Sequence, residues 1–287
     1  MNVSIIGSGV IGQATGIGLG MCGNKVVFYD IDKKKLKQLS DSGYEVVEKL
    51  SLAVEKADVI FVCVPTPTVD GLSDFGLVHE AVKGIGEVLG KNARYKVVVV
   101  RSTVLPSTTR SRVIPLLERH SGLKVGRDFG VCINPEFLRE KYALQDFLHP
   151  ARIVIGEFDK KSGDVLENIY CTFKIPIIRT DLDTAEMIKY VSNLFLATKI
   201  SFFNEIFLIC QKLGLDANLV SKAVSLDPRI GEYGVYGGSP FDGKCLPKDL
   251  AAFRSFVKSL NLNPELLDAV HSVNERMRSL NKGKNDK

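Results

Sequence analysis

The segment with the clearest chemical potential is Gly243-Lys244-Cys245-Leu246-Pro247-Lys248-Asp249. Its cysteine follows a glycine-rich loop and stands just before Pro247, a residue that suits the first turn of a helix. A thiol at a helix N-terminus and beside Lys244 and Lys248 is expected to favour the thiolate, so Cys245 is a candidate nucleophile for a carbonyl carbon. The local sequence fits an inert structural cysteine equally well.

A lysine and an asparagine form a second candidate pair. Lys189 and Asn193 lie four residues apart in a segment with helical periodicity, so they share one face of the expected helix. An ammonium and a carboxamide together could polarise a hydroxyl group or hold an oxyanion. Taken in isolation, such a pair is more often part of a solvated helix face.

Three polar segments directly follow apolar runs. They are Asn134-Pro-Glu136-Phe-Leu-Arg139-Glu140, Arg101-Ser-Thr103 and Pro65-Thr66-Pro67. Open α/β sheets bind ligands at the carboxyl ends of their strands, and carboxylates placed there could orient water or move protons. Any one segment could be ordinary loop chemistry, but three segments at the same sheet edge favour a site.

The N-terminus carries a glycine pattern, Gly7-Ser-Gly9-Val-Ile-Gly12, between the first apolar run and a helical stretch. In a dinucleotide-binding turn the first glycine permits the tight turn, the second lets a pyrophosphate approach, and the third lets the helix pack on the strand. Asp30 ends the next run, eighteen residues after Gly12, and would accept bonds from a ribose hydroxyl. We therefore expect NAD rather than NADP, although three lysines at 33–35 leave a phosphate option, and a scaffold without a nucleotide is the alternative.

Elements that alternate along the chain must position these groups. Up to residue 182, Val- and Ile-rich runs alternate with amphipathic stretches, which predicts a Rossmann-type, doubly wound parallel sheet in an α/β domain. The predicted strands are residues 3–6, 25–29, 59–64, 96–100, 130–133, 152–155 and 175–178, and the predicted helices include 33–39, 76–89 and 107–118.

A long helix is expected to follow. Residues 184–213 contain no Gly or Pro and keep helical apolar spacing, with Thr184 as the expected cap and Gly214 as the end. At 1.5 Å per residue this helix would be ~45 Å long, enough to join two domains or form a subunit interface. With further helices at 218–225, 247–260 and 264–280, we expect an NAD-binding Rossmann domain at 1–182, an all-helical domain with Cys245 at 183–280, and a frayed basic tail at 281–287.

Composition excludes several classes of protein. The formal charge of +5 in 287 residues lies mostly in the C-terminal segment 276–287, where five basic residues face one acidic residue, so no nucleic-acid partner is expected. No uninterrupted run of 18 apolar residues occurs, so no membrane association is expected either. Six scattered cysteines without metal-type spacing predict no metal site and a reducing, cytoplasmic location.

Eight motifs in order resemble the UDP-glucose/GDP-mannose dehydrogenase family, and UDP-glucose 6-dehydrogenases most of all. They are GSGVIG at 7–12, VPTP at 64–67, STV at 102–104, NPEFLRE at 134–140, PARIVIG at 150–156, AEMIKYVSN at 185–193, DPRIG at 227–231 and CLPKD at 245–249. The family oxidises the C6 hydroxyl of a nucleotide sugar to a carboxylate in two hydride transfers to NAD. The resemblance implies thiohemiacetal and thioester intermediates on Cys245.

The resemblance also implies residue roles. The catalytic residues would be Cys245, Lys189, Asn193, Asp249, Thr103, Glu136 and Glu140. The cofactor would contact Gly7, Gly9, Ile11, Gly12, Asp30, Lys35, Thr66, Thr103, Glu140 and Lys248. The sugar nucleotide would contact Phe137, Leu138, Arg139, Glu140, Lys189, Asn193, Arg229 and Gly243, with Arg229 reaching into the other subunit of a homodimer built on the long helix.

Three departures from the family pattern stand out. Family members continue beyond the point where this sequence ends, into a third, nucleotide-binding domain, which could be lost or supplied as a separate chain. The segment between Asp30 and Val59 is shorter than usual. The family's Phe-Gly-Gly before the cysteine reads Phe241-Asp242-Gly243, so we expect negative charge near the sugar and a strained backbone at Asp242. A two-electron hydroxyacid dehydrogenase of the hydroxyisobutyrate type and a non-catalytic NAD-binding partner subunit are the alternatives.

Overall fold

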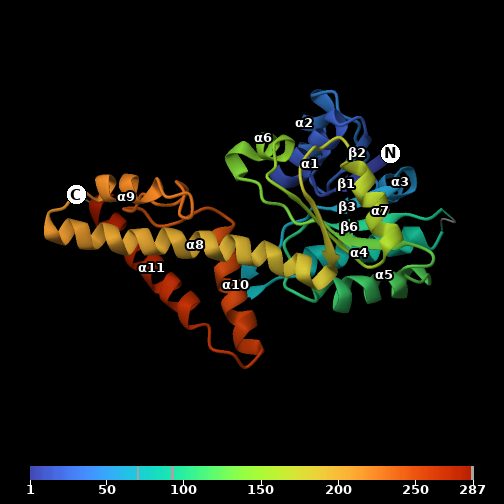
Figure 1. Cartoon of the computed structure of the whole chain (residues 1–287). Helices are drawn as coiled ribbons and strands as arrows, with labels where there is room; N and C mark the ends of the chain where they lie inside the picture. The colour runs from blue at the N-terminus through green and yellow to red at the C-terminus, as the bar shows by residue number, and fades with distance from the viewer. Residues whose placement is uncertain (70, 92–93, 286–287) are drawn as a thin grey trace. The chain divides into compact units, whose positions relative to one another are not determined.

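A computed structural model describes residues 1–69, 71–91 and 94–285 of the chain, with side chains as far as residue 282. The chain divides into two compact units (Figure 1). The first unit comprises Met1–Pro67 and Asp74–Lys189, and the second comprises Thr68–Ser73 and Tyr190–Lys287. The division falls within one helix, α8, which spans Leu182–Leu213.

The first unit is built on a seven-stranded sheet in the order β2-β1-β3-β6-β7-β8-β9. The strands are β1 Asn2–Ile6, β2 Lys25–Tyr29, β3 Val59–Val62, β6 Val97–Val100, β7 Gly130–Ile133, β8 Ile153–Glu157 and β9 Ile177–Asp181. All neighbours are parallel except β7 and β8. The predicted Rossmann-type α/β fold is confirmed, but the sheet is mixed. Only short helical turns lie between β7 and β8, so β8 starts at the edge where β7 ends and runs back.

Helices cover both faces of this sheet. They are α1 Val10–Met21, α2 Lys33–Asp41, α3 Leu50–Lys56, α4 Gly76–Leu89, α5 Ile114–Ser121, α6 Ala143–Leu148 and α7 Lys160–Ile169, with a π-helical turn at Thr109–Val113 and a 3-10 turn at Glu140–Tyr142. Alternate strand residues enter two separate cores: Ile60 and Val62 pack with α3, α4 and α5, whereas Val59 and Phe61 pack with α1, α2, α6 and α7. Both faces are therefore buried, which explains the unbroken apolar runs.

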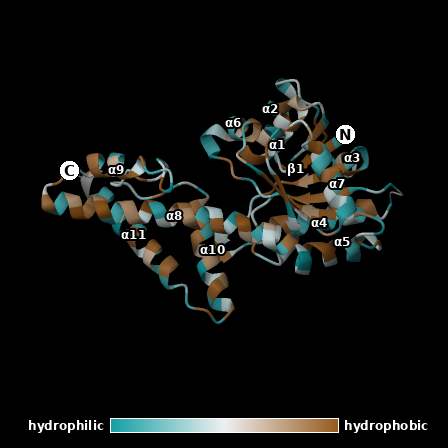
Figure 2. Ribbon diagram, in the orientation of Figure 1, coloured by the Kyte–Doolittle hydropathy of each residue, from teal (hydrophilic) through white to brown (hydrophobic). Residues whose placement is uncertain are grey.

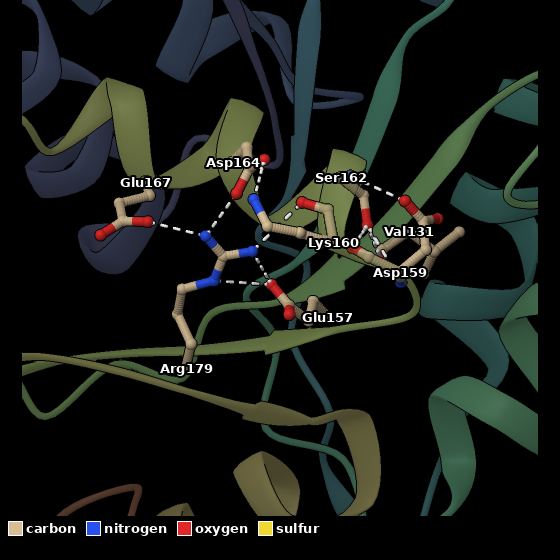
Figure 3. Close-up of polar contacts among 8 residues, drawn as sticks. All are labelled: Val131, Glu157, Asp159, Lys160, Ser162, Asp164, Glu167 and Arg179. Atoms are coloured by element: carbon tan, nitrogen blue, oxygen red, sulfur yellow. Dashed lines mark hydrogen bonds and ion pairs between the residues drawn. The ribbon is translucent and has the colours of Figure 1, made fainter.

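An arginine on β9 ties the reversed strands to helix α7 (Figure 3). The guanidinium of Arg179 donates to Glu157 on β8 at 2.8 Å, and to Asp164 and Glu167 on α7 at 2.5 and 2.8 Å. The three carboxylates raise the pKa of Arg179 above its ordinary value, although burial opposes this. Strand β9 then leads directly into α8.

The second unit is helical. It holds the rest of α8, α9 Ala217–Ser225, α10 Leu246–Ser259 and α11 Glu265–Asn285, together with a hairpin of β4 Thr68–Val69 and β5 Leu72–Ser73. The hairpin packs on α10, where the Thr68 hydroxyl donates to the Lys248 carbonyl at 3.3 Å. The predicted helices are present, and α11 continues to Asn285 through most of the segment that was expected to be frayed.

The start of α8 differs from the prediction. Asp181, rather than Thr184, acts as the cap: its carboxylate accepts the Thr184 N–H at 3.0 Å and the Thr184 hydroxyl at 2.6 Å. The helix therefore starts at Leu182, two residues earlier than expected. Its end agrees with the prediction, because Gly214 follows Leu213 with a φ of +68°.

Helix α8 is also long and apolar enough to cross a membrane, judged by length and composition alone (Figure 2). Its most apolar window has a mean hydropathy of 1.4, although the sequence contains no uninterrupted run of 18 apolar residues. A single helix of this kind is weak evidence, because core helices of globular proteins pass the same test. Here Tyr190, Ala197 and Phe203 are buried within the chain.

Candidate active site

The glycine turn after β1 has the geometry of a dinucleotide-binding loop. Gly7 has a φ of +97°, and a Cβ there would lie 2.8 Å from the Cys63 carbonyl oxygen. A Cβ on Gly12 would lie 1.9 Å from the Gly7 carbonyl oxygen, whereas one on Gly9 would meet nothing within 4 Å. Open space at Gly9, at the uncapped N-terminus of α1, fits the approach of a pyrophosphate.

The acidic residue of the motif lies beside this turn. Asp30 is buried, and its carboxylate accepts the Ser8 N–H at 2.6 Å and the Asp32 N–H at 2.9 Å. The Lys35 ammonium lies 3.6 Å from the same carboxylate. A fixed carboxylate at the end of β2 suits a ribose hydroxyl, so the residues present fit NAD.

A buried ion pair joins two predicted catalytic residues within the first unit. Lys189 Nζ lies 2.9 Å from Glu136 Oε1, and both side chains are buried. The Leu138 N–H donates to Glu136 Oε2 at 2.7 Å. Burial by itself would raise the pKa of Glu136, but Lys189, the Leu138 N–H and Arg101 together hold it below its ordinary value. Glu136 is thus a carboxylate at neutral pH.

The residues after Glu136 differ in their contacts and exposure. The Phe137 ring has the Arg152 guanidinium carbon 3.9 Å from its centroid and the Lys189 ammonium 5.6 Å from it. Arg139 binds Asp146 through two nitrogens, at 2.9 and 2.6 Å, so its guanidinium is partly engaged already. Leu138 is half-buried, and Glu140 is exposed at the start of the 3-10 turn.

Two predicted cofactor segments are hydrogen-bonded to one another. The Thr66 hydroxyl donates to the Thr103 carbonyl at 2.8 Å, and the Ser102 hydroxyl donates to the Val64 carbonyl at 2.6 Å. The ends of β3 and β6 are therefore joined at the same edge of the sheet as the glycine turn, as the sequence predicted.

In the second unit, Cys245 is the N-cap residue of α10. It is exposed and forms no disulfide, and its carbonyl accepts the Asp249 N–H at 2.9 Å. Pro247 is in the first turn, as expected. The helix dipole at this position favours a negative charge, which is the form in which a thiol attacks a carbonyl.

A buried carboxylate follows one turn later on the same helix. Asp249 is 1% exposed; it accepts from the Asn193 amide at 2.6 Å, and its other oxygen lies 2.6 Å from the Lys248 ammonium. The structure thus brings together Asn193 and Asp249, both of which the sequence placed among the candidate catalytic residues. The structure adds that Lys248, expected at the cofactor, is already paired with Asp249.

The glycine-rich loop corrects one expectation. Asp242 has no positive φ, so the strain expected at this position is absent, and its carboxylate pairs with Arg278 at 3.2 Å. Gly243 takes the left-handed conformation instead, with a φ of +82°. Arg229 is exposed and held by Asp227 of the same chain at 2.5 Å.

Sequence reasoning assigned no role to two arginines at this edge of the sheet, although Arg101 opens one of the predicted polar segments. Arg152 stacks on Phe137, and Arg101 is buried in a hydrogen-bond network with Asn134. The available signal was an arginine directly beside an apolar strand, where a charge must be either solvated or specifically bound.

A dinucleotide-type turn on a Rossmann sheet, followed by a helical unit with an exposed cysteine at a helix N-terminus, defines a two-unit oxidoreductase of the nucleotide-dependent class. Comparison with protein families gives the same result. The NAD binding domain of the UDP-glucose/GDP-mannose dehydrogenase family matches residues 48–174, and the central domain of that family matches residues 183–276. A model described as NADP oxidoreductase coenzyme F420-dependent matches residues 2–76.

The chain belongs to the UDP-glucose/GDP-mannose dehydrogenase family. It is 37% identical to the GDP-mannose 6-dehydrogenase of Pseudomonas putida, over 96% of this chain and 68% of that protein. It is 38% identical to a UDP-glucose 6-dehydrogenase of Bacillus subtilis, over 96% of this chain and 63% of that protein. It is thus an NAD-binding member of a family of nucleotide-sugar 6-dehydrogenases.

Solved structures support the same assignment. The UDP-glucose dehydrogenase of Pyrobaculum islandicum matches with a TM-score of 0.89 at 36% identity, over 96% of this chain and 68% of that chain. The GDP-mannose dehydrogenase of Pseudomonas aeruginosa matches with a TM-score of 0.77 at 36% identity, over 96% of this chain and 69% of that chain. A 3-hydroxyisobutyrate dehydrogenase of Mycobacterium tuberculosis, 18% identical with a TM-score of 0.73 over 97% of this chain and 94% of that chain, shares the fold alone.

Proposed function

We propose that the protein oxidises the C6 hydroxyl of UDP-glucose to the carboxylate of UDP-glucuronate, with NAD⁺ as the hydride acceptor in both steps. The observation that carries this proposal is Cys245 at the N-terminus of α10, one turn before the buried Asp249 that Asn193 holds. A two-electron alcohol dehydrogenase needs no such thiol. UDP-glucose is proposed ahead of GDP-mannose because the motifs resemble UDP-glucose 6-dehydrogenases most of all, while the relatives include enzymes named for both substrates.

Cys245 would retain the half-oxidised sugar. The first hydride transfer, with loss of the hydroxyl proton, leaves an aldehyde, and the thiolate adds to its carbon to form a thiohemiacetal. A second hydride loss gives a thioester, and water then cleaves the C–S bond to release the carboxylate and the thiolate. The balanced reaction consumes two NAD⁺ and one water for each sugar and releases two NADH and three protons.

Lys189 would stabilise negative charge at the oxidised carbon, and Glu136 would accept a proton there. The Lys189 ammonium has three N–H donors and gives one to Glu136, so others can stabilise an oxyanion. Glu136, kept ionised by this pairing, would accept the proton of the attacking water during thioester hydrolysis. Thr103 and Glu140 would hold this water and contact the nicotinamide.

Asn193 and Asp249 would complete the hydrogen bonding of the substrate. The Asn193 amide gives one N–H to Asp249 and retains a second for an oxygen of the sugar. Asp249, bound by Asn193 and Lys248, would orient that amide. This pairing supports a positioning role for Lys248 beside the predicted contact with NAD.

The remaining predicted contacts form two sets. Those proposed for NAD are Gly7, Gly9, Ile11, Gly12, Asp30, Lys35, Thr66 and Lys248. Those proposed for the sugar nucleotide are Phe137, Leu138, Arg139, Arg229 and Gly243. We also propose the division into an NAD-binding domain at 1–182 and a helical domain at 183–280, with action in the reducing cytoplasm. None of the six cysteines, all of them described, forms a disulfide.

We propose a homodimer through α8. Exposed apolar residues recur at helical spacing along it: Val191, Phe195, Phe202, Ile209 and Leu213 are 49–65% exposed. At 100° per residue these five positions fall within a stripe about 40° wide, the pattern of a helix that packs against a partner. Arg229, which is held by Asp227, would then reach into the second subunit.

The test is the NADH yield per sugar nucleotide. With limiting UDP-glucose and excess NAD⁺, we expect two NADH per substrate, and Cys245→Ala should abolish this turnover. Cys171→Ala is the matched control, because Cys171 is also exposed and free of a disulfide. One NADH per substrate, unaffected by Cys245→Ala, would indicate a two-electron dehydrogenase. NAD⁺ binding without turnover of UDP-glucose or GDP-mannose would indicate a non-catalytic partner.

A further inference from the structure

Arg101 is a buried cation at the carboxyl end of the central strand β6. It is 6% exposed, and among the described residues no carboxylate forms an ion pair with it. A buried guanidinium without a paired anion is costly unless its N–H groups are all well bound. The atoms that bind the guanidinium therefore indicate the function of this charge.

Its partners belong to two elements of the proposed site. Arg101 Nε donates to the Thr15 hydroxyl on α1 at 3.1 Å. Arg101 Nη1 donates to the Asn134 carbonyl at 3.2 Å and also to the Asn134 side-chain oxygen. The guanidinium carbon lies 5.7 Å from the centroid of the Phe147 ring on α6.

Asn134 is fixed from several directions. The Tyr170 hydroxyl donates to its side-chain oxygen at 2.6 Å, and its amide donates to the Val154 carbonyl at 2.7 Å. Only Pro135 separates Asn134 from Glu136. Proline fixes its own φ and restricts the residue before it, so the hold on Asn134 narrows the paths by which the backbone can reach Glu136.

Thr15 links the same guanidinium to the dinucleotide turn. The Thr15 hydroxyl donates to the Ile11 carbonyl at 2.7 Å, in the first turn of α1. This turn follows the glycine loop, and its free N–H groups point to the anion site. One side chain therefore contacts both the helix that serves the proposed cofactor and the segment that carries the proposed base.

We infer that Arg101 is a positioning residue that holds the Glu136 segment and helix α1 to the end of the sheet in one fixed geometry. The inference rests on the proposed function in so far as Glu136 acts on the substrate and α1 on NAD. The charge of Arg101 also affects the ionisation of Glu136. Burial raises the pKa of Glu136, and Arg101 acts with Lys189 on α8 and the Leu138 N–H to bring that pKa below its ordinary value.

A first experiment compares Arg101→Met with Arg101→Lys in the turnover of UDP-glucose. We expect Arg101→Met to lower kcat at least tenfold and to move the acid limb of the kcat–pH profile to higher pH, because Glu136 then takes up a proton more readily. Arg101→Lys keeps the charge without the planar fork, so it should restore the acid limb and only part of kcat. If Arg101 had a purely structural role, Arg101→Met would lower the amount of folded enzyme and leave the acid limb of the kcat–pH profile at the same pH.

A second experiment does not depend on turnover. The unfolding free energy is measured against pH for the wild type, Arg101→Met, Glu136→Gln and the double variant. A lowered native pKa gives stability that is lost as pH falls. We expect this loss to be smaller, and complete at a higher pH, in Arg101→Met, because the native pKa of Glu136 then lies nearer its unfolded value, and this shift to vanish when Glu136 is also replaced.

Lys96→Met is the matched control. Lys96 stands just before β6, is also buried, and donates to the Glu55 carbonyl at 3.0 Å, far along the strand from the site. We expect Lys96→Met to lower the unfolding free energy without changing the pH range over which stability is lost on the acid side. An equal shift in Lys96→Met, or none in Arg101→Met, would overturn the inference. If Arg101→Met does not fold, Thr15→Val takes its place, with weaker NAD⁺ binding by calorimetry expected and unchanged NAD⁺ affinity as the contrary result.

A protein that gives the expected unfolding curves but oxidises no sugar nucleotide would remove the proposed function and keep the positioning role. The reverse result, normal two-NADH turnover with no Arg101-dependent shift, would remove the positioning role and keep the function.

Discussion

Removal of one partner of the Lys189–Glu136 pair should be the most destabilising change among the site residues. The two charges are 2.9 Å apart, and their side chains are 6% and 7% exposed. Coulomb's law at an effective dielectric constant of ~20 gives an attraction of about 6 kcal/mol at this distance, most of which offsets desolvation. Truncation of one partner of a buried pair typically costs about 3–5 kcal/mol, because the other charge stays buried.

We therefore expect Lys189→Met to lose about 3–5 kcal/mol of unfolding free energy at pH 7, and the double variant Lys189→Met/Glu136→Gln to recover most of it. The sign of the pH dependence follows from the lowered pKa of Glu136. Stability from the pair is present above the unfolded-state pKa and is lost as pH falls through the native one. In Lys189→Met the buried carboxyl can protonate, so the deficit should shrink towards pH 5.

Chemical denaturation at pH 5, 6, 7 and 8 measures this deficit, and an unchanged m-value would show that the extent of unfolding is the same. A loss below about 1 kcal/mol at pH 7, or one that does not vary between pH 5 and pH 8, would refute the reasoning, since an uncompensated buried carboxylate must respond to protons.

Three further experiments test other parts of the structure. Arg179→Met should lose about 1–2 kcal/mol in urea denaturation, because three carboxylates then face each other in partial solvent exposure, and high salt should reduce the loss. Gly12→Ala should lower the melting temperature sharply, because its Cβ would lie 1.9 Å from a carbonyl oxygen, whereas Gly9→Ala should leave it unchanged and weaken NAD⁺ binding in calorimetry. Phe195→Asp should convert the proposed dimer to monomer in analytical ultracentrifugation, because that side chain is 64% exposed within the apolar stripe on α8.

The sheet could be predicted because each strand carries its own signal. Apolar side chains point alternately to two buried faces, so β3 and β6 contain no polar residue. Strand direction carries no such signal. The reversal at β8 depends on where the chain between β7 and β8 turns back, and single-strand composition is the same for both directions.

The site was less predictable, because the partners of its charges are distant in sequence. Lys189 and Asn193 share a helix face, as expected, but each binds a different carboxylate, one 53 and the other 56 residues away along the chain. Asp242 seemed strained by comparison with a family glycine, yet the backbone places the left-handed turn at Gly243. Pairings of this kind follow from tertiary structure rather than from local pattern.

The pairing of its lysines bears on how such a site can act. Lys189 is bound to Glu136, and Lys248 to Asp249, so both ammonium groups are paired with a carboxylate, and Lys189 is buried as well. An ammonium has three donors, and a carboxylate that takes one fixes the direction of the others. An oxyanion that forms within reach of Lys189 would gain a donor already oriented and desolvated, which costs little reorganisation. The proposed oxyanion role of Lys189 therefore does not require the ion pair to break; it requires the pair to stay in place.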